Sequence, residues 1–175
     1  MNRAVFLDRD GVINQGIVRE GRPYAPTHLR DFKLLPKVSD AITCFRENFF
    51  KVIVITNQPD VRSGKVTLET VEAMHDRLRN SLPIDDIRVC YHIDEDGCEC
   101  RKPKPGMLID AACIWDIDLN NSFMVGDRWR DVEAGNAAGC QTIFIDAGYQ
   151  EKQPDNPNYI VSNLIEAVPL ILTSN

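Results

Sequence analysis

The chain has 175 residues, of which 43% are hydrophobic and 26% charged, so one domain could bury about 70% of the surface that the unfolded chain exposes. Its formal net charge of -6 argues against non-specific binding to nucleic acid, which needs clustered Lys and Arg. The apolar stretch before Asp8 is too short for a secretion signal and no later run approaches the ~18 residues that span a bilayer, so we expect a cytoplasmic, monomeric protein of one domain, 1–175.

The first predicted strand, 4–7, is apolar and is followed directly by Asp8, Arg9, Asp10 and Gly11. Side chains alternate along an extended backbone, so Asp8 and Asp10 can face one site while Arg9 points elsewhere. Two carboxylates held so close repel each other unless a cation neutralises them, so the pair predicts an ion with oxygen ligands, with Mg²⁺ as the natural candidate. An Asp-rich turn after an edge strand is the alternative that this motif alone leaves open.

Strand-like and helix-like segments alternate along the rest of the chain. Residues 15–36 are polar and broken by glycine and proline, and we expect a long loop there. Residues 57–60 are expected to form a polar turn. Apolar periodicity predicts helices that begin near residues 37, 68, 105, 131 and 163, and buried strands at 51–56, 87–92, 122–126 and 141–145. This alternation predicts an α/β fold with a parallel sheet flanked by helices.

Polar residues stand where the predicted strands end, which is where open α/β sheets bind their ligands. Thr56 ends the second strand and Asn57 follows it, Lys102 lies beyond the third, and Asp127 follows the fourth. In that order, the motifs F-L-D-R-D-G, I-T-N-Q, C-R-K-P and V-G-D-R-W-R-D resemble those of the haloacid dehalogenase superfamily of aspartate-nucleophile phosphatases, over about residues 4–150. The resemblance implies a Rossmann-like three-layer sandwich with a mainly parallel sheet and a minimal cap.

The resemblance also implies a phosphomonoester hydrolase that forms an aspartyl-phosphate. Asp8 would be the nucleophile and Asp10 the general acid and base. Asp8, Asp10 through its carbonyl, and Asp127 would hold magnesium, while Thr56 and Lys102 would stabilise the phosphoryl group. The substrate would be bound by Asn57, Arg101, Arg128 and Arg19.

Other polar residues carry more than one interpretation. Asp131 either orients metal-bound water or caps the helix that follows. Besides Arg19, the 15–36 loop contains Arg22, Tyr24 and His28, and we expect the loop to line the substrate entrance. His75 lies on a predicted helix, where it is solvated or part of the packing.

The segment 90–102 contains three cysteines and a histidine within eleven residues: Cys90, His92, Cys98 and Cys100. This is a complete Cys₃His ligand set, which predicts a structural zinc ion. A disulfide is the alternative, although a cytosolic setting and the closeness of Cys98 and Cys100 in sequence disfavour it. The other cysteines are expected to be inert core residues, namely Cys44, Cys113 and Cys140.

A zinc loop beside C-R-K-P narrows the resemblance to small phosphatases that act on D-glycero-D-manno-heptose 1,7-bisphosphate and on histidinol phosphate. Gly106-Met107 and the compact chain favour the heptose bisphosphate, hydrolysed at position 7. The short zinc loop and Pro59-Asp60 leave histidinol phosphate or another small phosphorylated metabolite open. A zinc-stabilised binding protein without turnover is the third possibility. It is disfavoured because all four residues expected to take part in the reaction are present, namely Asp8, Asp10, Lys102 and Asp127.

Overall fold

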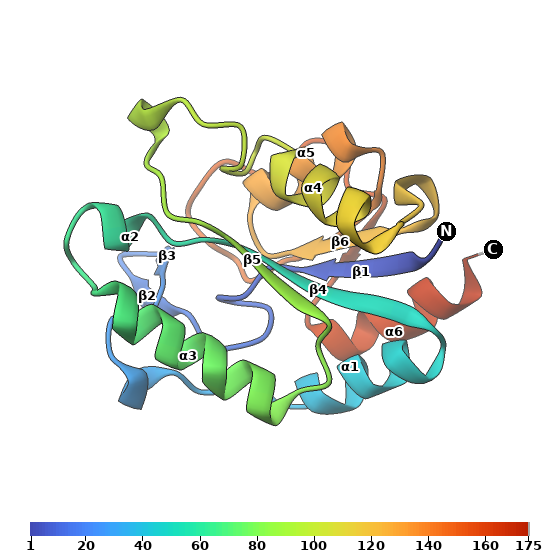
Figure 1. Ribbon diagram of the computed structural model, residues 1–175, viewed down its shortest axis with the longest axis horizontal. Coiled ribbons are helices and arrows are strands. Elements are labelled where there is room, and N and C mark those ends of the chain that lie inside the picture. The colour runs from blue at the N-terminus through green and yellow to red at the C-terminus, as the bar shows by residue number, and fades with distance from the viewer. Residues whose placement is uncertain (175) are drawn as a thin grey trace.

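The computed structural model describes residues 1–174 and contains a six-stranded parallel sheet (Figure 1). The strands lie in the order β5 (Asp86–Cys90), β4 (Phe50–Asn57), β1 (Arg3–Leu7), β6 (Phe123–Gly126), β7 (Gln141–Ile145) and β8 (Tyr159–Val161). Each neighbouring pair is parallel, so the polar residues that follow β1, β4 and β6 come out at one edge of the sheet. The expected α/β architecture is confirmed.

Helices cover both faces of this sheet (Figure 1). One face carries α4 (Gly106–Trp115) and α5 (Trp129–Ala138), and the other carries α1 (Val38–Glu47), α3 (Leu68–Ser81) and α6 (Leu164–Thr173). Alternate side chains of β1 point to opposite faces, so Val5 and Leu7 join one hydrophobic core while Ala4 and Phe6 join the other. Because both faces are covered, β1 is apolar from residue 4 to residue 7, and the acidic groups appear only after it ends.

The segment 15–36, expected to be a loop, contains an antiparallel hairpin of β2 (Ile17–Arg19) and β3 (Arg22–Tyr24). Between the strands, Glu20 and Gly21 have φ values of 49° and 75°, the left-handed backbone that a two-residue hairpin turn requires. Strands of three residues are too short for alternation to be recognised in sequence, which is why the pattern indicated only a loop.

Several element ends also differ from expectation. β5 ends at Cys90 rather than at residue 92, and the polar turn expected at 57–60 is split between the end of β4 and the short helix α2 (Pro59–Arg62). β8 was not anticipated. The last helix begins as predicted, because Asn163 accepts a hydrogen bond from the Glu166 amide and the Glu166 carboxylate accepts one from Ser162 N–H.

The burial of three residues decides between the expected surroundings. His75 is fully buried, which confirms that it is part of the packing, whereas Cys113 is exposed rather than part of the core. Cys44 is half-buried, whereas Cys140 is buried as predicted.

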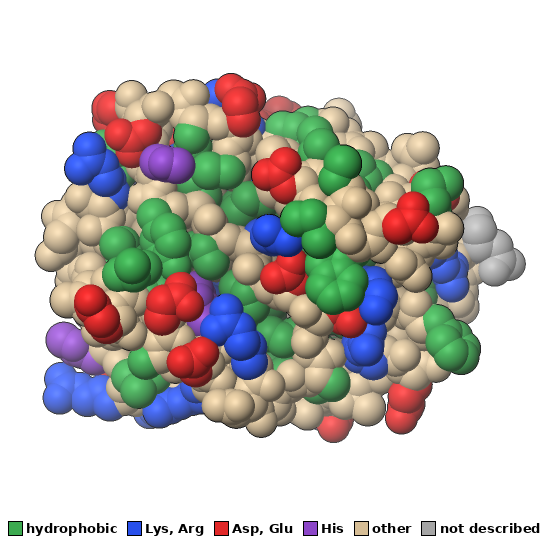
Figure 2. All heavy atoms as spheres, viewed as in Figure 1, with side chains coloured by type: hydrophobic (Ala, Val, Ile, Leu, Met, Phe, Trp, Pro, Cys, Tyr) green, Lys and Arg blue, Asp and Glu red, His purple; other side chains and the backbone are tan. Residues whose placement is uncertain are grey.

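On the face shown in Figure 2, Lys and Arg side chains are interspersed with Asp and Glu rather than gathered into the band that a nucleic-acid backbone would need. Within residues 1–174, every helix is too short or too polar to cross a membrane.

Candidate active site

A cavity of about 330 Å³ opens at the carboxyl edge of the sheet. Its acidic side chains come from Asp8 and Asp10 after β1, Asp60 on α2 and Asp131 on α5. Basic side chains surround them: Arg22, Lys65, Arg101, Lys102, Arg128 and Arg130. The cavity therefore presents cations to an anionic ligand although the chain as a whole is acidic.

Lys102 joins two of the carboxylates in a buried ion-pair cluster. Its ammonium lies 2.9 Å from Asp8 Oδ1 and 2.6 Å from Asp131 Oδ1, and it donates to the Ile55 carbonyl at 2.8 Å. Lys102 is 2% exposed. Burial opposes its charge, but the ion pairs with Asp131 and Asp8 outweigh that effect and raise the pKa of Lys102.

A third carboxylate, Asp127, brings the cluster to an excess of negative charge. One carboxylate oxygen each from Asp8, Asp127 and Asp131 lie within 4.8 Å of one another, against the single ammonium of Lys102. Burial raises the pKa of Asp127 well above its usual 3.8, and Asp8 and Asp131 add to the effect. Burial likewise raises the pKa of Asp8 to about 6. The negative charge of Asp131 raises this pKa further, and the positive charge of Lys102 lowers it.

Both oxygens of Asp127 are buried, and neither has a donor in hydrogen-bond geometry among residues 1–174, although the Tyr149 hydroxyl lies near enough to lower the pKa of Asp127 somewhat. A buried carboxylate without a partner is costly unless a cation binds it. The Asp8, Asp127 and Asp131 group could therefore hold a divalent cation with oxygen ligands, such as Mg²⁺.

Gly11 is required where the chain turns beside this group. Its φ of +88° is left-handed, and a Cβ at this position would lie 1.8 Å from Asp127 Oδ2. The backbone therefore passes closer to the carboxylate than any residue with a side chain would allow.

Asp10 is held by three neighbours. Its carboxylate accepts hydrogen bonds from Asn14 Nδ2 at 2.9 Å and Gln58 Nε2 at 2.8 Å, and it pairs with the Arg9 guanidinium at 3.0 Å. Arg9, expected to point elsewhere, turns back onto Asp10, because strand geometry ends at Leu7 and no longer imposes alternation.

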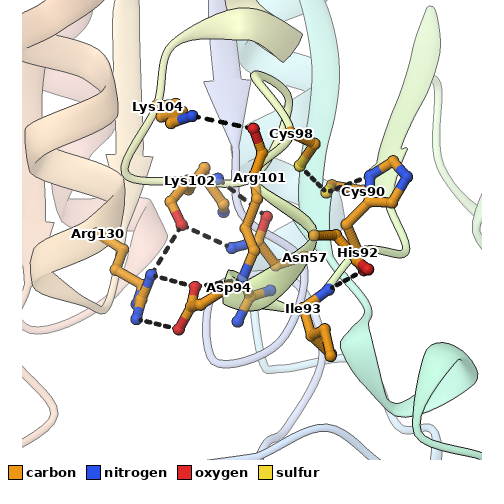
Figure 3. A network of polar contacts seen from close by, with 12 residues as sticks. Asn57, Cys90, His92, Ile93, Asp94, Cys98, Arg101, Lys102, Lys104 and Arg130 are labelled. Atoms are coloured by element: carbon orange, nitrogen blue, oxygen red, sulfur yellow. Dashed lines mark hydrogen bonds and ion pairs between the residues drawn. The ribbon is translucent and has the colours of Figure 1, made fainter.

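Thr56 and Asn57 follow one another but contact different parts of the site. Thr56 is buried behind the cavity lining, where its Oγ1 accepts a hydrogen bond from Gln58 Nε2 at 3.0 Å. Asn57 lines the cavity and makes two hydrogen bonds with the backbone of Lys102, each 3.1 Å long (Figure 3). Asn57 Nδ2 donates to the Lys102 carbonyl, and the Lys102 backbone N–H donates to Asn57 Oδ1.

Two arginines of the cavity share the carboxylate of Asp94. Arg101 Nε donates to Asp94 Oδ1 at 2.7 Å, and Arg130 Nη2 donates to Oδ2 at 3.1 Å (Figure 3). Arg130 also donates to the Lys102 carbonyl at 3.2 Å. Sequence reasoning missed Arg130, although its position directly before Asp131 in V-G-D-R-W-R-D was an available signal.

Arg128 and Arg19 complete the expected set. Arg128 lines the cavity and pairs with Glu151 at 2.5 Å, which raises the pKa of Arg128. Arg19 does not reach the cavity lining, because its guanidinium lies over the Tyr24 ring at 5.8 Å, and this part of the expectation needs correction. Arg22 and Tyr24 of the same hairpin provide the wall instead.

Asp131 caps α5 from position N3, in line with one of its two interpretations, and its role toward metal-bound water stays a prediction. Its Oδ2 accepts a hydrogen bond from Arg128 N–H at 3.0 Å, which caps α5, while Oδ1 pairs with Lys102.

The segment after β5 brings four potential metal ligands together. Sγ of Cys100 lies 3.0 Å from that of Cys90 and 3.4 Å from that of Cys98, and 3.3 Å from His92 Nδ1. A bonded pair would place its sulfurs about 2.0 Å apart, so these are free thiols and not a disulfide. A tetrahedral zinc ion with bonds of about 2.3 Å would space its sulfur ligands by about 3.8 Å. Four ligand atoms within 4.8 Å of one another fit such an ion.

One thiol of this group is poised to ionise. Burial opposes ionisation of Cys98, but hydrogen bonds with the Arg101 backbone and the Cys100 and Cys90 side chains lower the pKa of Cys98 to about 7. A thiolate is the form that binds a metal.

Comparison with known proteins places this geometry among phosphatases. A HAD-hydrolase-like family model matches residues 99–167. A D-glycero-beta-D-manno-heptose-1,7-bisphosphate 7-phosphatase of Pseudomonas putida is 37% identical over 155 residues, which cover 86% of each chain. A D-glycero-D-manno-heptose-1,7-bisphosphate 7-phosphatase of Thermosynechococcus vestitus is 31% identical and covers 97% of this chain and 95% of its own.

Solved structures show the same relationship. The D,D-heptose 1,7-bisphosphate phosphatase of B. bronchiseptica, complexed with magnesium and phosphate, superimposes with a TM-score of 0.84 at 30% identity. The match covers 97% of this chain and 98% of the other.

Proposed function

The chain belongs to the haloacid dehalogenase-like phosphatases, in the family of the heptose-1,7-bisphosphate 7-phosphatases, and on this basis we propose that it hydrolyses D-glycero-D-manno-heptose 1,7-bisphosphate at the 7-phosphate. The observation that carries the proposal is the buried cluster of Asp8, Lys102 and Asp127, in which the Asp127 oxygens have no donor in hydrogen-bond geometry among residues 1–174, next to a cationic cavity that Asp8 and Lys102 line. A binding protein would gain nothing from keeping such a cluster, because unpaired buried charge is destabilising.

In the proposed reaction, the Asp8 carboxylate attacks phosphorus, and the bond from phosphorus to the sugar oxygen breaks. The product on the protein is an aspartyl-phosphate. Lys102 keeps the Asp8 carboxylate in place at 2.9 Å and offers positive charge to the transferring phosphoryl group. Thr56 was expected to stabilise the phosphoryl group directly, but it is buried behind the cavity lining, and we propose that it acts indirectly by accepting from the Gln58 amide that contacts Asp10.

Asp10 lines the same cavity as Asp8, and we assign to it the proton transfers of the reaction. It protonates the departing sugar oxygen and then takes a proton from the water that hydrolyses the aspartyl-phosphate. One residue thus acts first as acid and then as base.

Mg²⁺ would be held by Asp8, the backbone carbonyl of Asp10 and Asp127, and the orphaned oxygens of Asp127 fit that requirement. When bound, it neutralises charge between the anionic nucleophile and the anionic phosphate. Asp131 supports this group from α5 through Lys102.

Substrate recognition falls to the cationic rim of the cavity. Asn57, Arg101 and Arg128 line it as the resemblance implies, and Arg22 takes the place that Arg19 does not reach. We propose that a structural zinc ion binds Cys90, His92, Cys98 and Cys100, and that it orders the segment that continues into Arg101 and Lys102.

The test is phosphate release by the purified protein with magnesium, measured on heptose 1,7-bisphosphate, histidinol phosphate and common sugar phosphates. We expect kcat/KM to be highest for the heptose bisphosphate, with the 1-phosphate retained in the product. A higher value for histidinol phosphate would replace the substrate and leave the phosphatase activity standing. Absence of release from every phosphomonoester would overturn the proposal.

A further inference from the structure

Behind Asp10 lies a charged side chain that the proposed reaction does not use. Arg9 is 0% exposed, and its guanidinium faces the Asp10 carboxylate with two nitrogens, Nε at 3.2 Å and Nη2 at 3.0 Å from Oδ2. The guanidinium also lies over the Phe32 ring, 5.6 Å from its centroid. Burying an arginine completely is unfavourable unless its donors are satisfied, so the remaining partners of Arg9 matter.

The remaining partner is His75 on α3, 66 residues away in sequence and also 0% exposed. Arg9 Nη1 lies 3.0 Å from His75 Nε2. A guanidinium can only donate, so Nε2 must accept, and the proton of the imidazole must sit on Nδ1. Burial and the charge of Arg9 both lower the pKa of His75, to about 4, so the ring is the neutral acceptor that this contact requires.

The other side of the imidazole is held as well. His75 Nδ1 lies 3.3 Å from Glu72 Oε1, one turn earlier on α3. The same oxygen accepts a hydrogen bond from the hydroxyl of Tyr91 at 2.6 Å. Tyr91 stands between Cys90 and His92 of the Cys₃His group, so the contacts extend without a break from that group to Asp10.

We propose that His75 is a positioning residue for the reaction: it fixes Arg9, and Arg9 fixes the rotamer of Asp10 for proton transfer to and from the substrate oxygen. The inference rests on the proposed function, because it concerns the acid and base role of Asp10. His75 does not touch the Asp10 carboxylate and acts on it only through Arg9, and both residues lie outside the cavity lining.

The experiment uses the dependence of rate on the leaving group. A sugar alkoxide leaves well only if Asp10 protonates it, whereas p-nitrophenolate leaves without a proton. The value of kcat/KM reports on the first step, in which the leaving group departs. It is measured for the best alkyl phosphate of the panel and for p-nitrophenyl phosphate in the wild type, Asp10→Asn, His75→Phe and His75→Gln.

We expect His75→Phe to lower kcat/KM by about 10-fold or more for the alkyl phosphate but by less than about 3-fold for p-nitrophenyl phosphate. His75→Gln supplies an amide oxygen that can accept from Arg9, and should recover most of the loss. Equal losses on both substrates, or full activity in folded His75→Phe, would overturn the proposal.

Two further variants keep the test decisive. If His75→Phe does not fold, Glu72→Ala tests the same role, because Glu72 anchors the imidazole and its side chain is 43% exposed. We expect Glu72→Ala to lower kcat/KM about 3-fold more for the alkyl phosphate than for p-nitrophenyl phosphate, and Glu69→Ala on the same helix to show no such difference.

Asp10→Asn distinguishes a failure of the proposed function from a failure of the positioning role. If it lacks the leaving-group discrimination, the acid role in the proposed function fails; if it shows discrimination that neither His75→Phe nor Glu72→Ala shows, only the positioning role fails.

Discussion

Lys102 Nζ donates to Asp8 Oδ1 at 2.9 Å although 94 residues separate the two in sequence. The pair is nearly inaccessible to water, and Asp131 contacts the same ammonium from a third segment. Removing one partner of such a cluster leaves an uncompensated buried charge on the other. Changes at these positions therefore affect both the rate of the reaction and the stability of the fold, and each has to be measured separately.

Replacing the nucleophile is expected to abolish turnover. In Asp8→Asn the amide cannot attack phosphorus, so kcat should fall by at least about 10⁴-fold. The measurement is phosphate release under saturating substrate, with circular dichroism to show that the fold is kept. Residual activity within about tenfold of the wild type would exclude Asp8 as the nucleophile.

The same variant tests the pKa of Asp8 through stability. In the metal-free protein Asp8 titrates near 6 when folded and near 3.8 when unfolded, so the folded state binds more protons between these values. The ionised carboxylate thus lowers the free energy of unfolding as pH rises from about 4 to 6. We expect the stability of Asp8→Asn relative to the wild type to grow over this window by on the order of 1 to 3 kcal/mol.

Urea unfolding after chelator treatment, at several pH values from 4 to 7, measures this difference. His75, whose pKa is lowered to about 4, acts in the opposite direction but is present in both proteins, so its contribution cancels. A difference that stays constant with pH would contradict the assignment.

Gly11→Ala is expected to disrupt the proposed magnesium site, because its Cβ would overlap Asp127 Oδ2. At saturation, Mg²⁺ should raise the midpoint of thermal unfolding of the wild type by about 5 °C or more and that of Gly11→Ala much less. Gly16→Ala is the matched control, since its Cβ would meet Tyr24 O at an ordinary 3.6 Å. Equal magnesium shifts in both variants would count against the site.

Loss of a Cys₃His ligand should release zinc. The purified protein is expected to hold one equivalent of zinc, and Cys98→Ser to hold none and to melt about 5 °C or more below the wild type. Cys113→Ser serves as the control, because Cys113 is exposed on α4, away from the group. Metal analysis that finds no zinc in the wild type would refute this prediction.

Asp94→Asn should loosen Arg101 and Arg130 together, since Asp94 pairs with both. Re-ordering one such side chain on binding costs about 0.5 to 1.5 kcal/mol, so kcat/KM should fall roughly 2- to 12-fold. Glu95→Gln, in the same 3₁₀ segment, is exposed and should leave kcat/KM unchanged. An unchanged kcat/KM in Asp94→Asn would show that the shared carboxylate does not hold the arginines for binding.

Much of this protein is determined locally and could be predicted from sequence. Residues 4–7 are apolar because both faces of β1 are covered there, and the first acids appear where that burial ends. In a parallel sheet the ends of neighbouring strands share one edge, so the sequence predicts that Asp8, Asn57 and Asp127 converge. The Cys₃His group is likewise local, since its ligands lie within one segment.

The tertiary structure alone decided which side chains meet across long separations. The Asp94 bridge between Arg101 and Arg130, and the contact of Arg9 with His75, depend on how loops and α3 pack against the sheet edge. No periodicity in the sequence reports such packing, because periodicity gives only the face of an element on which a side chain lies. For the same reason the sequence suggested both Arg19 and Arg22 at the substrate entrance, and only the fold of the hairpin decides that Arg22 lines the cavity.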